Sequence, residues 1–166
     1  PLQIIIDPHS IAVTSIAFDP GEKLLKNSLS ETATPYIHGR ILSGETLCQS
    51  GRKRLIGLVE NAFSGEPFWG VRLNWARALG KCKTPSAHKA ILNLLPHETH
   101  PLVQVELATA LGNHSSHRSA QALHEFLQRV DIGYPAREAA LISMGKQRVY
   151  VIWEDLMDGL SDDGWY

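Results

Sequence analysis

From residue 34 onward, apolar residues recur with the spacing of one helix face, and this pattern repeats along the chain. Residues 71–80 read VRLNWARALG, and their apolar positions fall at i, i+4, i+5 and i+8, namely Val71, Trp75, Ala76 and Leu79. Such a stripe is typical of an amphipathic helix that packs on one side. The segment therefore predicts a helix whose apolar face is covered by another part of the fold.

The same pattern returns twice downstream, at shifts of about one repeat length. Residues 103–112 read VQVELATALG, and residues 136–145 read AREAALISMG. A weaker copy occupies residues 40–48, where Gly39 and Gly44 are expected to interrupt the helix. A fixed period of this kind indicates a repeat architecture built from one supersecondary unit.

The small and apolar residues of these copies are predicted to pack helix against helix in successive repeats. The glycine that closes each copy is expected to adopt the left-handed conformation and so to end its helix. The predicted packing residues are Val71, Trp75, Ala76, Leu79, Gly80, Val103, Leu107, Ala108, Leu111, Gly112, Ala136, Ala140, Leu141, Met144 and Gly145.

A second helix is predicted after each copy. Ser86–Leu95 follows Thr84 and Pro85, a capping residue and a proline suited to the first helical turn. The other second helices are predicted at Arg52–Phe63, Ser119–Leu127 and Val149–Leu160. One helix pair is too thin to bury its own apolar stripe, so neighbouring pairs must cover it. The sequence predicts an all-α fold, an α-solenoid of about four helix pairs, over residues 28–166.

The first 27 residues differ from the rest because they are rich in β-branched side chains. Leu2–Ile6 and Ile11–Phe18 indicate one or two short strands, separated by the turn sequence at Asp7 and Pro8. A two-stranded piece is marginal by itself. We expect residues 1–27 to be a β-strand remnant and junction from a preceding β-sandwich domain, and the chain, which begins at Pro1, to be part of a longer protein.

Composition and charge exclude some classes of partner. Sixteen Lys and Arg against 17 Asp and Glu leave a formal net charge of -1, whereas binders of nucleic acid or anionic membranes need a surplus of cations. No apolar run approaches the ~20 residues of a membrane span. Two cysteines are typical of a reducing compartment. We expect a cytoplasmic protein that binds neither nucleic acid nor membrane.

Candidate chemistry is sparse. His97 and His100 stand three residues apart, where the zinc motif HExxH needs four. Cys48 and Cys82 have no CxxC neighbour and are expected to act as small buried hydrophobes. Phosphate-binding loops, dinucleotide fingerprints and nucleophile elbows do not occur in the sequence. We predict no catalytic residue, no cofactor and no metal in this chain.

One polar column accompanies the repeats. Corresponding positions of the four copies hold Arg40, Arg72, Gln104 and Arg137. This column is either a ligand-binding ladder or a set of bridges to carbonyls and acids of the next repeat. The uncharged Gln104 favours the second interpretation.

Two phrases carry a resemblance to a known family. Residues 18–26, FDPGEKLLK, resemble the junction of M1-family metallopeptidases that leads from a small β-sandwich domain into a C-terminal helical domain. Residues 66–72, EPFWGVR, followed by ALG at 78–80, are similar to the repeat of that family's HEAT-like tails. The ALG repeats alone are shared by many HEAT-type proteins.

The resemblance implies that the chain is a non-catalytic C-terminal domain of about four HEAT-like helix pairs from an aminopeptidase N-like zinc enzyme. It would pack against the catalytic and β-sandwich domains of its own parent chain and limit substrate access, with zinc held in the parent catalytic domain. The alternative is a stand-alone HEAT-repeat scaffold that binds another protein. A DNA-handling solenoid would need a basic concave groove, which the overall charge does not favour.

Overall fold

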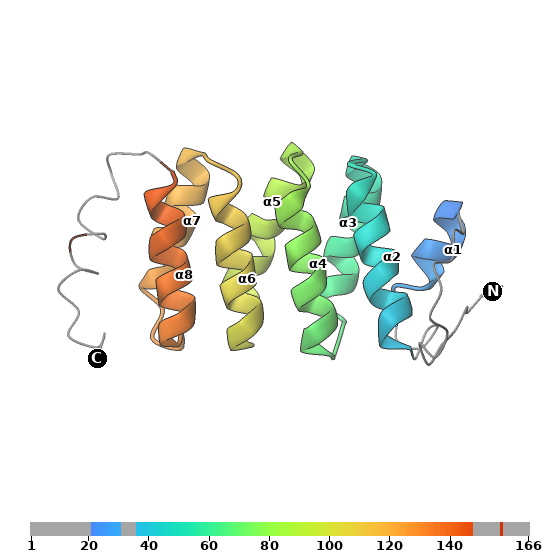
Figure 1. Cartoon of the computed structure of the whole chain (residues 1–166), viewed down its shortest axis with the longest axis horizontal. Coiled ribbons are helices and arrows are strands. Elements are labelled where there is room, and N and C mark those ends of the chain that lie inside the picture. Colours follow the sequence, from blue (N-terminus) through green and yellow to red (C-terminus); the bar gives the residue numbers. More distant parts are fainter. Residues whose placement is uncertain (1–20, 31–35, 148–156, 158–166) are drawn as a thin grey trace, which may run out of the picture.

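The computed structural model describes residues 21–30, 36–147 and 157, and all regular elements in this part are helices (Figure 1). The helices are α1 (Gly21–Asn27), α2 (Ile37–Gln49), α3 (Lys53–Phe63), α4 (Trp69–Lys81), α5 (Pro85–Leu94), α6 (Pro101–Gly112), α7 (His117–Leu127) and α8 (Tyr134–Gly145), with a 3₁₀ turn at Leu95–His97. The expected strands Leu2–Ile6 and Ile11–Phe18, and all of the expected helix Val149–Leu160 except Met157, lie outside the described residues.

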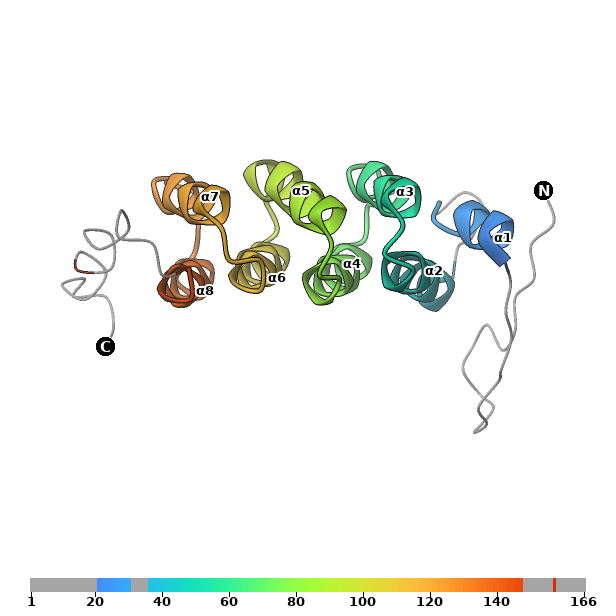
Figure 2. The same ribbon diagram turned by 90° about the horizontal axis from the view of Figure 1, so that it is seen from above.

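These helices stack in two layers (Figure 2). The first helices of the pairs, α2, α4, α6 and α8, form one layer, and the second helices, α3, α5 and α7, form the other. Contacts between neighbours are most extensive within the first-helix layer and sparser within the second. The described residues thus form an α-solenoid of three helix pairs followed by the first helix of a fourth, which confirms the predicted fold class.

Local signals in the sequence explain where several helices begin. The side chain of Thr84 accepts the backbone N–H of Ala87 at the start of α5, and Ser116 accepts that of Ser119 at the start of α7. Proline occupies the first turn of α5, α6 and α8. The missing N–H of proline costs nothing there, because the first amides of a helix have no intrahelical acceptor. None of the helices in the described part has the length and apolar character needed to cross a bilayer.

The core runs continuously between the two layers. Its largest fully buried side chain is Trp75, whose indole N–H donates to the carbonyl of Arg40 in the preceding repeat at 3.0 Å. Of the predicted packing residues, Gly112 and Leu141 are half-buried and Gly145 is exposed, while all others are buried. Each repeat therefore inserts part of its apolar stripe against the helix pair before it.

Glycines near the ends of the first helices have a different structural role from the one expected. Gly80, Gly112 and Gly145 are helical, and among the described residues only Gly21 and Gly51 have positive φ, at 67° and 66°. A Cβ on Gly80 would lie 2.8 Å from Cβ of Ala110, and one on Gly112 would lie 2.7 Å from Oγ of Ser143. The expectation of left-handed stops was wrong; at Gly80 and Gly112 glycine is required because neighbouring first helices approach too closely for a side chain.

The expected interruption of the first repeat was also wrong, since α2 is continuous from Ile37 to Gln49. A Cβ on Gly44 would overlap the indole of Trp75. The helix-propensity cost of about 1 kcal/mol for a glycine is therefore offset by the burial of a large aromatic side chain against α2. Together with α3, this helix completes a regular first pair.

Helix α1 was not predicted, and it lies within the 1–27 segment that the sequence assigned to a β-junction. It packs against α2, with Leu25 half-buried against the core and Leu29, just beyond its end, buried. Residues 21–29 therefore cover the side of the first helix pair that faces away from the second pair.

The close approach of the first helices yields a stability prediction. Gly80→Ala should lower the free energy of unfolding by about 1–3 kcal/mol, because the new methyl must displace α6. The matched control is Gly57→Ala in α3, where a Cβ would meet nothing within 4 Å; it should raise stability by about 0.5–1 kcal/mol. Urea denaturation followed by circular dichroism measures both, and equal effects of the two substitutions would contradict the packing role of Gly80.

Candidate interaction surface

Loops that join one helix pair to the next lie together along one edge of the stack, the lower edge in Figure 1. We call it the inter-repeat edge; it comprises residues 64–68, 95–100 and 128–133. Glu66 and Glu98 occupy corresponding places in the first two loops, and both are buried. A buried carboxylate is costly unless it is paired and hydrogen-bonded.

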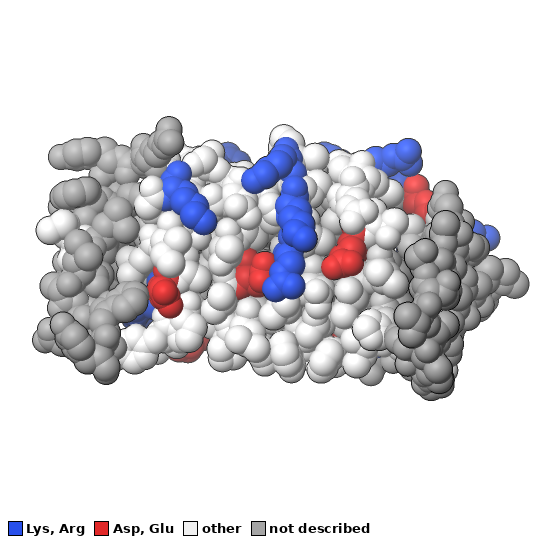
Figure 3. Space-filling view, viewed as in Figure 1, with Lys and Arg blue, Asp and Glu red and all other residues white. Residues whose placement is uncertain are grey.

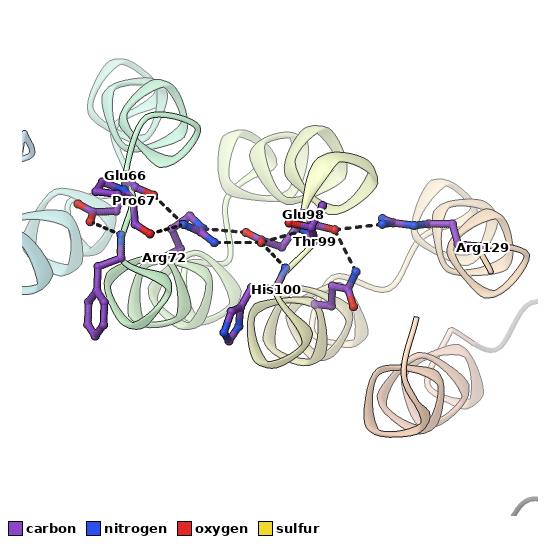
Figure 4. Close-up of polar contacts among 9 residues, drawn as sticks. Glu66, Pro67, Arg72, Glu98, Thr99, His100 and Arg129 are labelled. Atoms are coloured by element: carbon purple, nitrogen blue, oxygen red, sulfur yellow. Dashed lines mark hydrogen bonds and ion pairs between the residues drawn. The ribbon is translucent and has the colours of Figure 1, made fainter. Parts of the chain in front are cut away.

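Each of these carboxylates is paired with a member of the arginine column, as Figure 4 shows for Arg72 and Glu98. Arg40 donates to Glu66 through Nε at 2.8 Å and Nη2 at 3.2 Å. Arg72 donates to Glu98 through the same two atoms at 2.9 and 3.2 Å. Oε1 of each glutamate also accepts the backbone N–H two residues further on, at 2.9 Å for Glu66 and 2.8 Å for Glu98. We call each of these arginine–glutamate pairs a charged rung. Each charged rung joins a first helix to the loop that follows its helix pair.

Arg72 additionally binds the loop that precedes its own helix. Its Nη1 donates to the carbonyls of Glu66 at 2.7 Å and Pro67 at 3.2 Å, so one guanidinium connects two successive loops. At the next position of the column, Nε2 of Gln104 donates to the carbonyl of Glu98 at 3.0 Å. Gln104 thus binds the loop before its own helix, as Arg72 does, but it forms no ion pair with the loop that follows its helix pair.

The third loop is held differently. Asp131 stands three residues before α8, as Glu66 and Glu98 stand before α4 and α6, but it is exposed and pairs with Arg129 of its own loop. Arg129 also donates to the carbonyl of Glu98 at 3.1 Å. Arg137, the last member of the arginine column, is half-buried and has no ion pair within the described residues. Three of the four members of the column, Arg40, Arg72 and Gln104, therefore bind loops to helices.

A second surface is the outer side of the first-helix layer, which faces the viewer in Figure 3. We call it the first-helix face. Large apolar side chains are exposed on three of its helices: Leu42 of α2 (60%), Leu102 of α6 (48%) and Ile142 of α8 (54%). Figure 3 shows a stripe of basic residues that crosses the middle of this side from its upper edge, with acidic residues on either side of the lower end of the stripe. Arg77 of α4 and Glu106 of α6 are joined by an ion pair of 3.0 Å.

An aromatic pair lies where this face meets the inter-repeat edge. The rings of Trp69 and His100 stack with centroids 4.8 Å apart and an interplanar angle of 3°. Phe68 lies 5.6 Å from the Trp69 ring, and both aromatic residues are more than one third exposed. The stack holds the Trp69 indole in one orientation while leaving part of it open to another molecule.

Histidines also meet at the opposite edge, where His88 of α5 and His114 stack with centroids 5.3 Å apart. Nε2 of His88 lies 2.8 Å from Oγ of Ser119, and that hydroxyl donates to the carbonyl of His114. Burial lowers the pKa of both histidines below the ordinary 6.5, and the charge of Arg118 lowers that of His88 further. Ser119 is fully buried and engaged, so this Ser–His contact is not a nucleophile site.

The remaining candidates for chemistry are equally inert in the described part of the chain. Burial, aided by Cys82 and Glu45, raises the pKa of the Cys48 thiol to about 12, so it is not a thiolate at neutral pH. Among the described residues, no three His, Cys, Asp or Glu side chains gather in a way that could hold a metal ion.

The sequence indicated bridges from the arginine column to carbonyls and acids of the next repeat, but it did not point to Glu66 and Glu98 or to the exposed apolar residues. A signal for the first existed, because Glu66 and Glu98 follow Arg40 and Arg72 at the same interval in both repeats. Exposed positions such as Leu102 gave no such signal, since an apolar residue on a helix is assigned to the core until its neighbours are known.

Stacked helix pairs with a continuous core, charged rungs between the loops and open outer faces define a helical-repeat scaffold. A family model described as HEAT repeats matches residues 56–147, more than half of the chain. The chain belongs to the HEAT-repeat family. A comparison with curated proteins gives no match, and nothing in these findings connects the chain to an M1 metallopeptidase.

The buried rungs yield a second prediction. Arg40→Met should lower the free energy of unfolding by about 3–5 kcal/mol, because it leaves the Glu66 carboxylate buried without its partner. The control is Arg77→Met, which removes an exposed pair and should cost less than about 1 kcal/mol. Chemical denaturation measures both. A loss at Arg40 as small as that at Arg77 would show that the rung does not stabilise the stack.

The stacked histidines predict a pH dependence. Because the folded protein binds a proton at His88 less readily than the unfolded chain, whose histidine titrates near 6.5, acid favours the unfolded chain. Their contribution to stability is present above pH 6.5 and is lost as the pH falls through the lowered pKa values. His88→Gln should therefore reduce the fall in melting temperature between about pH 7 and pH 5. An unchanged pH profile in the variant would contradict this assignment.

Proposed function

We propose that this chain is a protein-interaction scaffold that binds its partner through the first-helix face. The observation that carries the proposal is the exposure of Leu42, Leu102 and Ile142 on three of the four first helices. Single exposed apolar residues are ordinary on soluble domains. A group of them on one side of the stack, with no further layer over that side in the described part, is typical of a docking surface.

Rigidity of the layer supports the same function. Gly80 and Gly112 lock the first helices at close range, and the charged rungs at Arg40 and Arg72 fix the loops between pairs. A surface that is already ordered loses little conformational entropy when it binds. Trp69, oriented by its stack on His100, is the type of side chain that anchors interfaces.

A more specific partner is suggested by the sequence phrases that resemble M1 metallopeptidases. Within EPFWGVR, the structure gives Glu66, Val71 and Arg72 internal roles, so such residues would serve any stack of this kind. Phe68 and Trp69 are exposed and have no such requirement. They support a second candidate function, in which this face packs on the catalytic domain of a zinc aminopeptidase in the same parent chain and restricts its substrates.

The second candidate is tested by the coding sequence that precedes Pro1. An upstream HExxH motif followed by a more distant zinc-binding glutamate supports it. Upstream coding sequence without such a motif contradicts the second candidate and leaves the interaction scaffold as the proposed function.

The scaffold itself is tested by paired variants. Cross-linking in a lysate of the source cells identifies proteins bound by the wild-type chain, and calorimetry with each purified partner gives its Kd. Leu42→Glu with Leu102→Glu should raise the Kd at least about tenfold, since it places charge at the centre of the contact. Val130→Glu, a control at an exposed apolar residue of the inter-repeat edge, should leave the Kd unchanged. Equal Kd values for both variants would mean that the partner does not bind the first-helix face.

A further inference from the structure

Charge is segregated between the two edges of the stack, although the sequence as a whole is nearly neutral. The turns within the helix pairs lie along the edge opposite the inter-repeat edge, the upper edge in Figure 1. We call this the turn edge. Its exposed basic residues are Arg52, Lys53, Arg54, Lys81, Lys83, Arg118 and Lys146. They lie at or just beyond the ends of α2, α4, α6 and α8. Several basic residues are visible along the upper side of Figure 3.

Acidic residues of the described part lie almost entirely elsewhere. Glu22 of α1 is the exception, and it pairs with Arg52 and Arg54. Glu45 and Glu106 lie within the first-helix layer, and the others are nearer the inter-repeat edge: Glu60, Glu66, Glu98, Glu125, Asp131 and Glu138. The cations of the second, third and fourth turns are therefore not neutralised by a described carboxylate.

One of these cations is also held in place. Nζ of Lys83 donates to the carbonyl of Asn113 in the next turn at 2.8 Å. Arg118 lies in the first turn of α7, close enough to His88 to lower the pKa of that histidine. Because His88 and His114 are stacked and neutral at pH 7, the positive charge of this edge belongs to its lysines and arginines.

We propose that the turn edge binds an acidic, extended segment of another protein. Neighbouring first helices in a packed layer are about 8–10 Å apart, so positive groups recur along the edge at about that interval. A polyproline II chain rises ~3.1 Å per residue with three residues per turn, which brings every third side chain to one side at ~9.3 Å spacing. A segment with a carboxylate at every third position matches the turns in both charge and period.

Nucleic acid fits this edge less well. Binding of single strands relies on aromatic side chains on which bases stack, and the turn residues 50–54, 81–84 and 113–118 contain no Phe, Tyr or Trp. The site is a row of exposed turns on a nearly neutral chain, whereas a polyanion with closely spaced phosphates requires a surplus of cations. The surface is also distinct from the first-helix face, so the inference does not depend on the proposed function.

The test uses the full chain and a fluorescent peptide of about 15 residues made of Glu-Pro-Pro triplets, which favours the polyproline II conformation. Fluorescence anisotropy at low salt should show saturable binding that weakens severalfold when salt is raised from about 20 to about 200 mM. The matched Gln-Pro-Pro peptide should not bind. Binding of both peptides alike, or of neither, overturns the proposal.

Charge variants locate the site. The triple variant Lys81→Gln, Arg118→Gln, Lys146→Gln should raise the Kd for the acidic peptide at least about tenfold. A control that removes three cations away from the edge, Lys26→Gln, Arg77→Gln, Lys89→Gln, should change it by less than about twofold, and circular dichroism confirms that both variants are folded.

Three further outcomes decide between this proposal and its rivals. Equal weakening by the two triple variants would show attraction to total charge only, and overturns the proposal. Tighter binding of an oligothymidylate of the same length would assign the edge to nucleic acid, and overturns it as well. Retention of peptide binding by the Leu42→Glu, Leu102→Glu variant supports it and separates this site from the first-helix face.

Discussion

The close approach of neighbouring first helices is the constraint on which the rest of the structure depends. Gly80 against Ala110 and Gly112 against Ser143 leave no room for a Cβ, so these helices can lie nearer to one another than ordinary side chains allow. That proximity brings the first two loops within reach of an arginine from the preceding first helix. It also places α2, α4, α6 and α8 in one layer with a common outer side.

Periodicity predicted the architecture well because the same apolar pattern occurs in three copies, and each copy independently indicates the same helix. The helix pairs, their order and most buried positions follow from three aligned copies, and Thr84 and Pro85 mark a boundary by simple capping chemistry. The role of glycine was predicted wrongly because a glycine near the end of a helix can serve either a left-handed turn or close helix packing, and the sequence looks the same in both cases. Only the neighbouring helix, as at Gly44 beside Trp75, distinguishes them.

Surface properties were less predictable. A net charge of -1 says nothing of how that charge is distributed. Many exposed basic residues of this chain lie in or beside the turns within pairs, whereas most of the described carboxylates lie elsewhere. Leu102 and Ile142 belong to apolar stretches that the sequence assigns to packing, yet they point outward. Burial on a helix is decided by which sides its neighbours cover, and this information is not local.

The unequal loops have a mechanical consequence. Charged rungs brace the loops after the first and second pairs, and Arg72 belongs to both joints. At the third loop the corresponding Asp131 pairs with Arg129 of the same loop, so no charged rung reaches this loop from α6. Under tension along the long axis of the array, this joint should depend on the packing of α6 against α8, the most extensive contact between neighbouring helices in the described part.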